Sequence, residues 1–214
     1  ACSACCARRS RRSRAWARCE MTSREDKEAK LTRAFEDLLR AVGRSPGTYP
    51  ELLDTPLRAK AMWLDDLLDG YEWDPAAILA GGTPVGTSPS IVIVRDMYFH
   101  SVCPHHLLPF HGLAHLAYYP GERVIGFSNL SRLVSCFAHR LTLQEEIGRG
   151  VANALVEHLG ARGAACLLDA EQLCMVVRGV RQVGSRVVTA AYAGSMAEDH
   201  ALRLEFLTAI GAKE

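Results

Sequence analysis

Two short segments, far apart in the chain, carry side chains that can bind one metal ion. Cys103 and His106 lie three residues apart in Cys103-Pro104-His105-His106, and Cys174 lies in a later apolar segment. A thiolate and an imidazole at this spacing can close on one ion, and a third soft ligand from a distant strand would leave one position for water. Three protein ligands plus water are typical of a catalytic zinc site. The fold must therefore bring the two segments together, and the pattern indicates an enzyme that activates water.

The ordinary alternative for each of these residues is structural. A lone cysteine is more often a buried apolar side chain than a ligand, and a lone histidine is more often a hydrogen-bonded polar residue. A purely structural zinc site would need a fourth ligand, and the available candidates are Cys166 and His111, neither at a convincing spacing.

Length and charge limit the classes of protein to which the chain can belong. It has 214 residues, of which 49% are hydrophobic, enough for one substantial domain with a helical appendage. The formal net charge is +1, but residues 1–20 hold six arginines and one glutamate, so the remainder carries about −4. We therefore expect no nucleic-acid partner for the folded part. No run of eighteen apolar residues occurs, so we expect no membrane partner either.

Three segments follow from the composition. Residues 1–22 are basic, and we expect a disordered tail, or translated sequence upstream of a start at Met21; the composition also fits an organelle transit peptide. Residues 23–86 are predicted to form a helical arm and a linker, with helices over 23–43 and 55–70. Residues 87–214 are predicted to form the catalytic domain.

Within residues 87–214 the pattern changes to β-branched strands followed by amphipathic helices. Because strands come in pairs around helices without β-α-β alternation, we expect an α+β fold with an antiparallel sheet and two helices. The predicted strands are 91–97, 113–119, 123–127, 164–168, 174–180 and 185–191, and the predicted helices are 131–140, 143–159 and 197–210.

The cysteines favour a reducing compartment. Four of the eight lie in the basic tail, and the others are Cys103, Cys136, Cys166 and Cys174. Four cysteines in a domain of this size, beside a Cys-x-x-His motif, indicate a metal site rather than a disulfide framework. We therefore expect a cytoplasmic protein.

Four sequence blocks resemble the GTP cyclohydrolase I family, in that family's order and spacing. They are Cys103-Pro104-His105-His106-Leu107-Leu108-Pro109-Phe110, Gly126-Phe127-Ser128-Asn129-Leu130-Ser131-Arg132, Leu143-Gln144-Glu145-Glu146 and Cys174-Met175-Val176-Val177-Arg178-Gly179-Val180. Thr55-Pro56-x-Arg58 matches too, and the similarity covers roughly residues 25–211. The resemblance implies a tunnelling-fold domain behind a helical N-terminal arm, assembled into a toroidal homodecamer with active sites between subunits.

The resemblance also implies a reaction and a zinc site. Cys103, His106 and Cys174 would hold Zn²⁺, and water would attack C8 of the purine of GTP. Ring opening, loss of formate and closure would then give 7,8-dihydroneopterin triphosphate, in tetrahydrofolate or pterin biosynthesis. His105 would donate and accept protons beside the metal, although it could instead only orient the site.

The remaining site residues are carried over in the same way. Glu145 would hold the guanine edge, because adjacent N1–H and N2–H₂ donors suit a carboxylate, and Gln144 lies beside it. Without the resemblance, Glu145 would be an ordinary acid in a helix's first turn. The resemblance makes His105, His106, Ser128 and Gln172 catalytic candidates. The substrate-binding candidates are Gln144, Glu145, Arg58, Arg132 and Arg178. The guanidinium groups of the three arginines can each donate two hydrogen bonds to phosphate oxygens.

The chain departs from the family's pattern at several positions. The family has a histidine two residues before the second zinc cysteine, where this chain has Gln172, which cannot carry a proton at neutral pH; His111 is a candidate substitute. Three cation positions of the phosphate clamp hold Asn129, Glu146 and Ala61, with Lys60 one place away from the third. Pro104 replaces a glutamate and is interpreted as structural.

These departures keep alternatives open. A homologue could stop at the ring-opened formamide or use a different guanine nucleotide. A catalytically silent, zinc-bearing purine- or pterin-binding protein is the alternative from another class. A zinc nucleobase deaminase is set aside, because its His-x-Glu and Pro-Cys-x-x-Cys motifs do not occur.

Overall fold

The computed structural model describes residues 23–45, 47–86 and 90–211. The expectation for residues 1–22 lies outside this range. The described chain divides into two compact units between Leu64 and Asp65. Among the described helices, none combines the length and the apolar character needed to cross a bilayer.

The first unit is a pair of helices, α2 (Arg24–Ala41) and α3 (Thr55–Ala61). The Ser23 side chain caps α2 by accepting a hydrogen bond from the Asp26 amide at 3.2 Å. Pro56 lies in the first turn of α3, where the amide that proline lacks would have no helical partner. The rings of Phe35 and Trp63 pack 6.3 Å apart. Both predicted helices are present, but the second becomes a π-helical turn, η2 (Met62–Leu67), before a 3₁₀ turn at 69–71.

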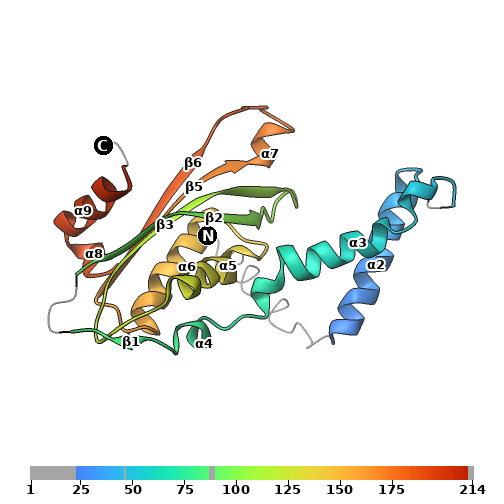
Figure 1. Cartoon of the computed structure of the whole chain (residues 1–214). Helices are drawn as coiled ribbons and strands as arrows, with labels where there is room; N and C mark the ends of the chain where they lie inside the picture. The colour runs from blue at the N-terminus through green and yellow to red at the C-terminus, as the bar shows by residue number, and fades with distance from the viewer. Residues whose placement is uncertain (1–22, 46, 87–89, 212–214) are drawn as a thin grey trace, which may run out of the picture. The chain divides into compact units, whose positions relative to one another are not determined.

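The second unit is built on a four-stranded antiparallel sheet in the order β2-β3-β5-β6 (Figure 1). Every neighbouring pair is antiparallel. A separate two-stranded ribbon pairs β1 (Thr83–Pro84) with β4 (Arg123–Val124). The bounds of the main strands are β2 Val92–Val102, β3 Pro109–Tyr119, β5 Gly163–Gln172 and β6 Val187–Gly194.

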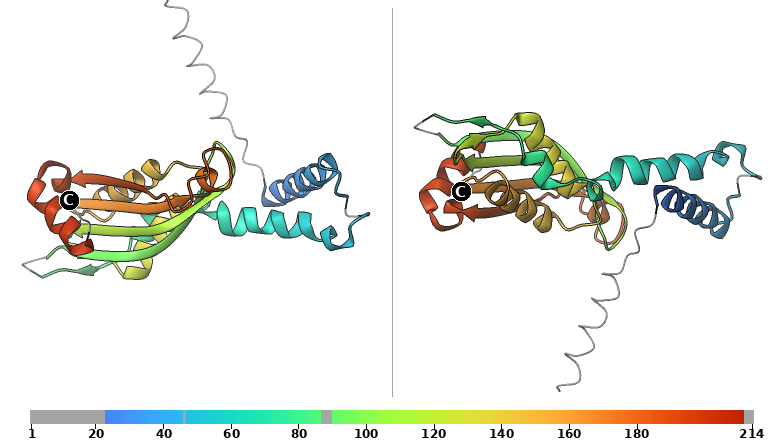
Figure 2. Two further views of the ribbon diagram at one scale, coloured as in Figure 1. Left: turned by 90° about the horizontal axis from the view of Figure 1, so that it is seen from above. Right: turned by 90° about the horizontal axis from the view of Figure 1, so that it is seen from below.

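Two helices cover one face of this sheet, α5 (Phe127–Ala138) and α6 (Gln144–Glu157), as Figures 1 and 2 show. Every second residue of the strands, Leu116 and Leu168 among them, faces these two helices and packs against their apolar sides in the main core. The intervening residues, Ala117 and Leu167 among them, face the other side and pack with α8 (Ser195–Glu198) and α9 (His200–Ile210). The expected α+β class, with an antiparallel sheet and two helices, is confirmed.

Some element predictions were wrong. The predicted strand 174–180 begins instead as a short helix, α7 (Leu173–Val176), and continues as a loop. Gly179 and Arg181 in this loop have positive φ values of 59° and 50°, which an extended strand cannot accommodate. Short helix α4 (Pro75–Leu79) was not predicted. The apolar run 123–127 forms only two strand residues before α5 begins at Phe127.

Candidate metal centre

The connection from β2 to β3 is a tight turn that presents the first two metal-ligand candidates. The Cys103 amide donates to the Leu108 carbonyl, and the Leu107 amide donates to the Cys103 carbonyl, both at 2.9 Å. Leu107 has a φ of 54°, a left-handed conformation that is uncommon for a leucine. This backbone reversal places His106 on the same side of the turn as Cys103.

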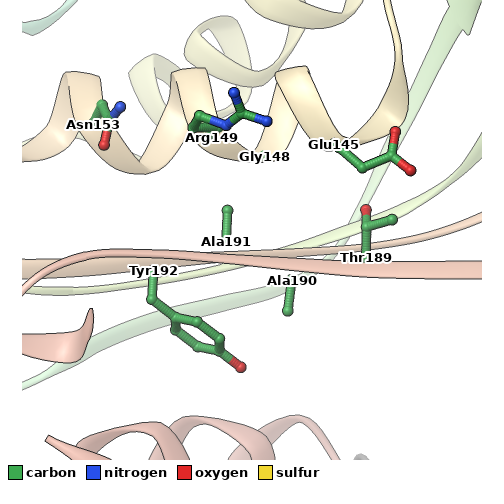
Figure 3. A pocket seen from close by; sticks show the side chains of 8 residues that line it. All are labelled: Glu145, Gly148, Arg149, Asn153, Thr189, Ala190, Ala191 and Tyr192. Carbon is green, nitrogen blue, oxygen red and sulfur yellow. The ribbon is translucent and has the colours of Figure 1, made fainter. Parts of the chain in front are cut away.

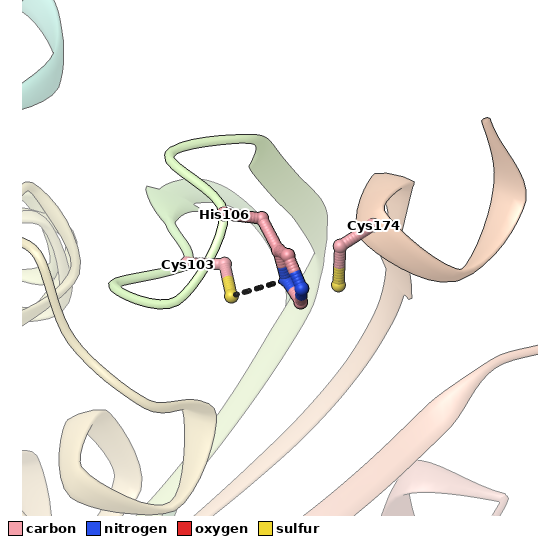
Figure 4. Close-up of side chains that lie close together, drawn as sticks. All are labelled: Cys103, His106 and Cys174. Atoms are coloured by element: carbon pink, nitrogen blue, oxygen red, sulfur yellow. Dashed lines mark hydrogen bonds between the residues drawn. The ribbon is translucent and has the colours of Figure 1, made fainter. Parts of the chain in front are cut away.

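The structure brings the third candidate to the same point (Figure 4). Cys174 lies in α7, immediately after β5, and the ligand atoms of Cys103, His106 and Cys174 all lie within 4.8 Å of one another. Cys103 Sγ and His106 Nδ1 are 3.8 Å apart. Zn–S bonds of about 2.3 Å and Zn–N bonds of about 2.0–2.1 Å in a tetrahedron put two such ligands about 3.6 Å apart. The donor set and its spacing therefore fit a zinc ion.

The two thiols are close enough to affect each other's charge state. Cys103 is 7% exposed and Cys174 is half-buried. Burial, and then the neighbouring Cys103, raise the pKa of the Cys174 thiol above its ordinary value. Two thiolates this close repel each other without a cation, and a divalent ion removes that repulsion.

A cavity of about 230 Å³ opens beside these ligands. His105 lines it from the turn between β2 and β3, with its Nδ1 3.9 Å from Cys103 Sγ. Gln172, the last residue of β5, and Glu145, in the first turn of α6, line it from other sides. The cavity therefore gathers an imidazole, a carboxamide and a carboxylate around the candidate metal centre.

Gln144 also borders the cavity, but its amide is occupied inside the protein. Its Nε2 donates to the main-chain carbonyls of Leu168 (3.0 Å) and Val187 (2.8 Å), and its Oε1 accepts a hydrogen bond from Gln172 Nε2 at 2.8 Å. The side chain thus ties α6 to both β5 and β6.

The catalytic candidate Ser128 and the three arginines expected to bind phosphate are not part of this cavity lining. Ser128 and Arg132 are exposed on α5, and Arg178 is exposed just after α7. Arg178 is nevertheless near enough for its charge to oppose the rise in the pKa of Cys174. Arg58 belongs to the first unit, where it pairs with Asp54 at 3.8 Å.

The positions that depart from the family's pattern have local partners of their own. Glu146 forms an ion pair with Arg149 at 3.2 Å along α6, and Lys60 forms one with Glu28 at 3.4 Å.

His111 lies 3.8 Å from Glu171 and alternates with Phe110, so it points to the face of β3 away from the cavity. Cys166 is fully buried in the core, and burial raises its pKa to about 12.

A second cavity, of about 430 Å³, lies between α6 and β6 (Figure 3). Glu145 lines both cavities. Arg149 and Asn153 reach this second cavity from α6, and Thr189 faces it from β6 with a buried hydroxyl that has no hydrogen-bond partner among the described residues.

Sequence reasoning missed several residues that line the metal cavity. Phe110 and Met175 stand inside blocks that resemble the family, so their position was a usable signal. Thr142 precedes a third block by one residue. No sequence pattern marked Val187 as a cavity residue, because it is brought to the cavity by the pairing of β6 with β5.

Comparison with known proteins gives a consistent match over most of the chain. A family model described as GTP cyclohydrolase I matches residues 31–211. A protein from Chromobacterium violaceum is 43% identical over 85% of this chain and 87% of its own length. One from Ralstonia nicotianae is 46% identical over 73% of this chain and 74% of its own length. One from Campylobacter lari is 37% identical over 86% of this chain and 96% of its own length. All three are named GTP cyclohydrolase 1.

Proposed function

Because this chain belongs to the GTP cyclohydrolase I family, we propose that it converts GTP and water to 7,8-dihydroneopterin triphosphate and formate. The proposed pathway is tetrahydrofolate or pterin biosynthesis. The proposed cofactor is Zn²⁺, held by Cys103, His106 and Cys174. When bound, zinc would lower the pKa of a water ligand towards neutrality.

One observation carries this proposal. The candidate ligands Cys103 and Cys174 share a cavity with His105 and Glu145, groups suited to proton transfer and to guanine binding. A structural metal site does not need such groups beside it, and it usually fills all four coordination positions with protein ligands. Three protein ligands next to a polar cavity favour a catalytic site.

His105 is proposed as the residue that moves protons during ring opening. An imidazole can donate through one ring nitrogen and accept through the other, and the exposed turn lets His105 exchange protons with solvent. It lies two residues from Cys103, so the same backbone turn sets its distance from the metal ligands.

Glu145 is proposed to bind the guanine edge. Its carboxylate can accept hydrogen bonds from N1–H and N2–H₂ together. Its place in the first turn of α6 favours a negative charge, because unpaired amide groups point outward there. Since Glu145 also lines the second cavity, a purine that it holds has space on two sides.

Arg132, Arg178 and Arg58 are proposed to bind the phosphates, and Ser128 is proposed as a catalytic residue near the ribose and triphosphate. The complete site is proposed to form between subunits of a homodecamer. β2 and β6 are the edges of the sheet, and no described strand pairs with the outer side of β6. Exposed strand edges favour pairing with another chain. Sedimentation analysis of the purified protein would test the decamer, and a monomer that turns over GTP would contradict it.

A second candidate reaction stops at the ring-opened formamide. Gln172 favours it, because a carboxamide that is hydrogen-bonded to Gln144 cannot deliver a proton as an imidazolium can. Formate release would then lack one proton donor. A different guanine nucleotide as substrate is the related alternative.

Mass spectrometry of products after incubation of the zinc-loaded protein with GTP tests these proposals. Dihydroneopterin triphosphate with free formate is expected. A product that keeps the formyl group would establish the second candidate, and unchanged GTP with measurable nucleotide binding would contradict both reactions and indicate a silent binding protein.

A matched pair of variants tests the guanine contact. Glu145→Gln should raise the KM for GTP strongly, whereas Glu157→Gln, at the other end of α6 and outside both cavity linings, should have little effect. Equal effects of the two variants would contradict the role of Glu145.

The proposed location is the cytoplasm. Cys103, Cys136, Cys166 and Cys174 are free thiols, and two of them are the proposed zinc ligands. Thiol ligands persist best where the surroundings are reducing. Fractionation of the native cells, with detection of the protein by antibody, tests this location.

A further inference from the structure

Gln144 is buried beside the metal cavity with both amide N–H groups in use. The residue is 3% exposed. Its two donors go to carbonyls on different strands, Leu168 on β5 and Val187 on β6. A flipped amide would bring Oε1 against these two carbonyl oxygens and would lose both hydrogen bonds. The orientation of the Gln144 side chain is therefore set by the sheet.

This orientation also determines how Gln172 is held. Gln144 Oε1 can only accept, so Gln172 must approach with its NH₂ group, as the 2.8 Å contact shows. The acceptor that remains on Gln172 is Oε1, and no described residue donates a hydrogen bond to it. Gln172 lines the same cavity as Cys103 and Cys174.

We propose that Gln144 is a positioning residue, which holds Gln172 so that a hydrogen-bond acceptor faces the metal cavity. A ligand N–H or O–H group can then donate to that oxygen, while the second N–H of Gln172, which Gln144 does not accept, remains available as a donor. Where it concerns GTP, this inference rests on the proposed function.

The test uses the full chain loaded with Co²⁺ in place of zinc, because the visible absorption of Co²⁺ reports changes close to the ion. The variants are Gln172→Met, Gln144→Met and the double variant. We expect each single variant to shift the Co²⁺ band and to lower kcat for GTP about three- to tenfold, the loss of roughly one hydrogen bond. The double variant should show no larger band shift than Gln144→Met alone, because Gln144 affects the metal cavity through Gln172.

Controls separate positioning from a general loss of stability. Ile147→Val, a core substitution on the same helix, should lower the melting temperature and leave the Co²⁺ band unchanged. Gln144→Leu has a similar size, carries no charge and can neither donate to the two carbonyls nor accept from Gln172, so it should reproduce the band shift of Gln144→Met. It provides the same test if the methionine variant does not fold.

The outcomes distinguish this inference from the proposed function. Additive effects in the double variant, or a Co²⁺ band that Gln172→Met does not move, would overturn the positioning role even if GTP is consumed. Coupled band shifts in a protein that does not consume GTP would support the positioning role and refute the proposed reaction.

Discussion

The main-chain amide of Asp96 donates a hydrogen bond to Nδ1 of His115 at 3.2 Å, across a bulge between β2 and β3. Asp96 has a φ of 60°, so this contact supports an uncommon backbone conformation. The acceptor role of Nδ1 requires a neutral ring with its proton on Nε2.

Acid should therefore destabilise the protein through His115. Burial lowers the pKa of His115 below 6.5, although Asp96 and Asp169 oppose this shift. A lowered folded-state pKa contributes stability that is present above the unfolded value of 6.5 and is lost as the pH falls through the folded value. Thermal melts from pH 7 to pH 5 should show this loss, and His115→Asn, which keeps an acceptor, should reduce it. Equal pH dependence in both proteins would contradict the prediction.

Removal of either thiolate ligand should abolish both metal binding and turnover. Cys103→Ser and Cys174→Ser each replace a soft ligand with a hydroxyl that binds zinc poorly. Elemental analysis and the GTP assay measure the two losses. Cys166→Ala, in the core, should keep wild-type metal content; full activity in a metal-depleted ligand variant would refute the catalytic zinc.

Gln172→His should raise the rate of the late steps, formate release above all. The new imidazole can donate N–H to Gln144 Oε1 and can also carry a proton. Rapid-quench analysis of formate and of the ring-opened species measures the change. An unchanged or lower rate would mean that another group already supplies the proton.

Gly112→Ala should destabilise the sheet beside the metal site. A Cβ at Gly112 on β3 would collide with the Asp169 carbonyl oxygen and come within 2.7 Å of Ala170 Cα on β5. We expect a loss of about 1–3 kcal/mol in the free energy of unfolding, measured by urea denaturation. Gly81→Ala, where a Cβ meets nothing within 4 Å, should change it little.

The sequence predicted the metal-ligand group because its information is local. Cys103 and His106 are three residues apart, and Cys174 stands in an equally recognisable block, so residue types and order sufficed to expect a shared site. Helix signals were also local: Ser23 and Pro56 mark the starts of α2 and α3 in the structure.

The α7 segment shows where local patterns misled. The three valines of the predicted strand 174–180 favour an extended chain, yet the chain turns there from β5 to β6 and adopts left-handed conformations at Gly179 and, just beyond, at Arg181. The strand preference of these residues was overridden, because the chain must reverse direction between the antiparallel strands β5 and β6.

By itself, the sequence determined the fold class, the candidate metal ligands and the departure at Gln172. Only the tertiary structure decided which group Gln172 bonds to, because its partner Gln144 is oriented by carbonyls on two strands that meet through sheet pairing. The direction of a buried amide depends on which donors and acceptors surround it in space, and residue order does not encode those neighbours.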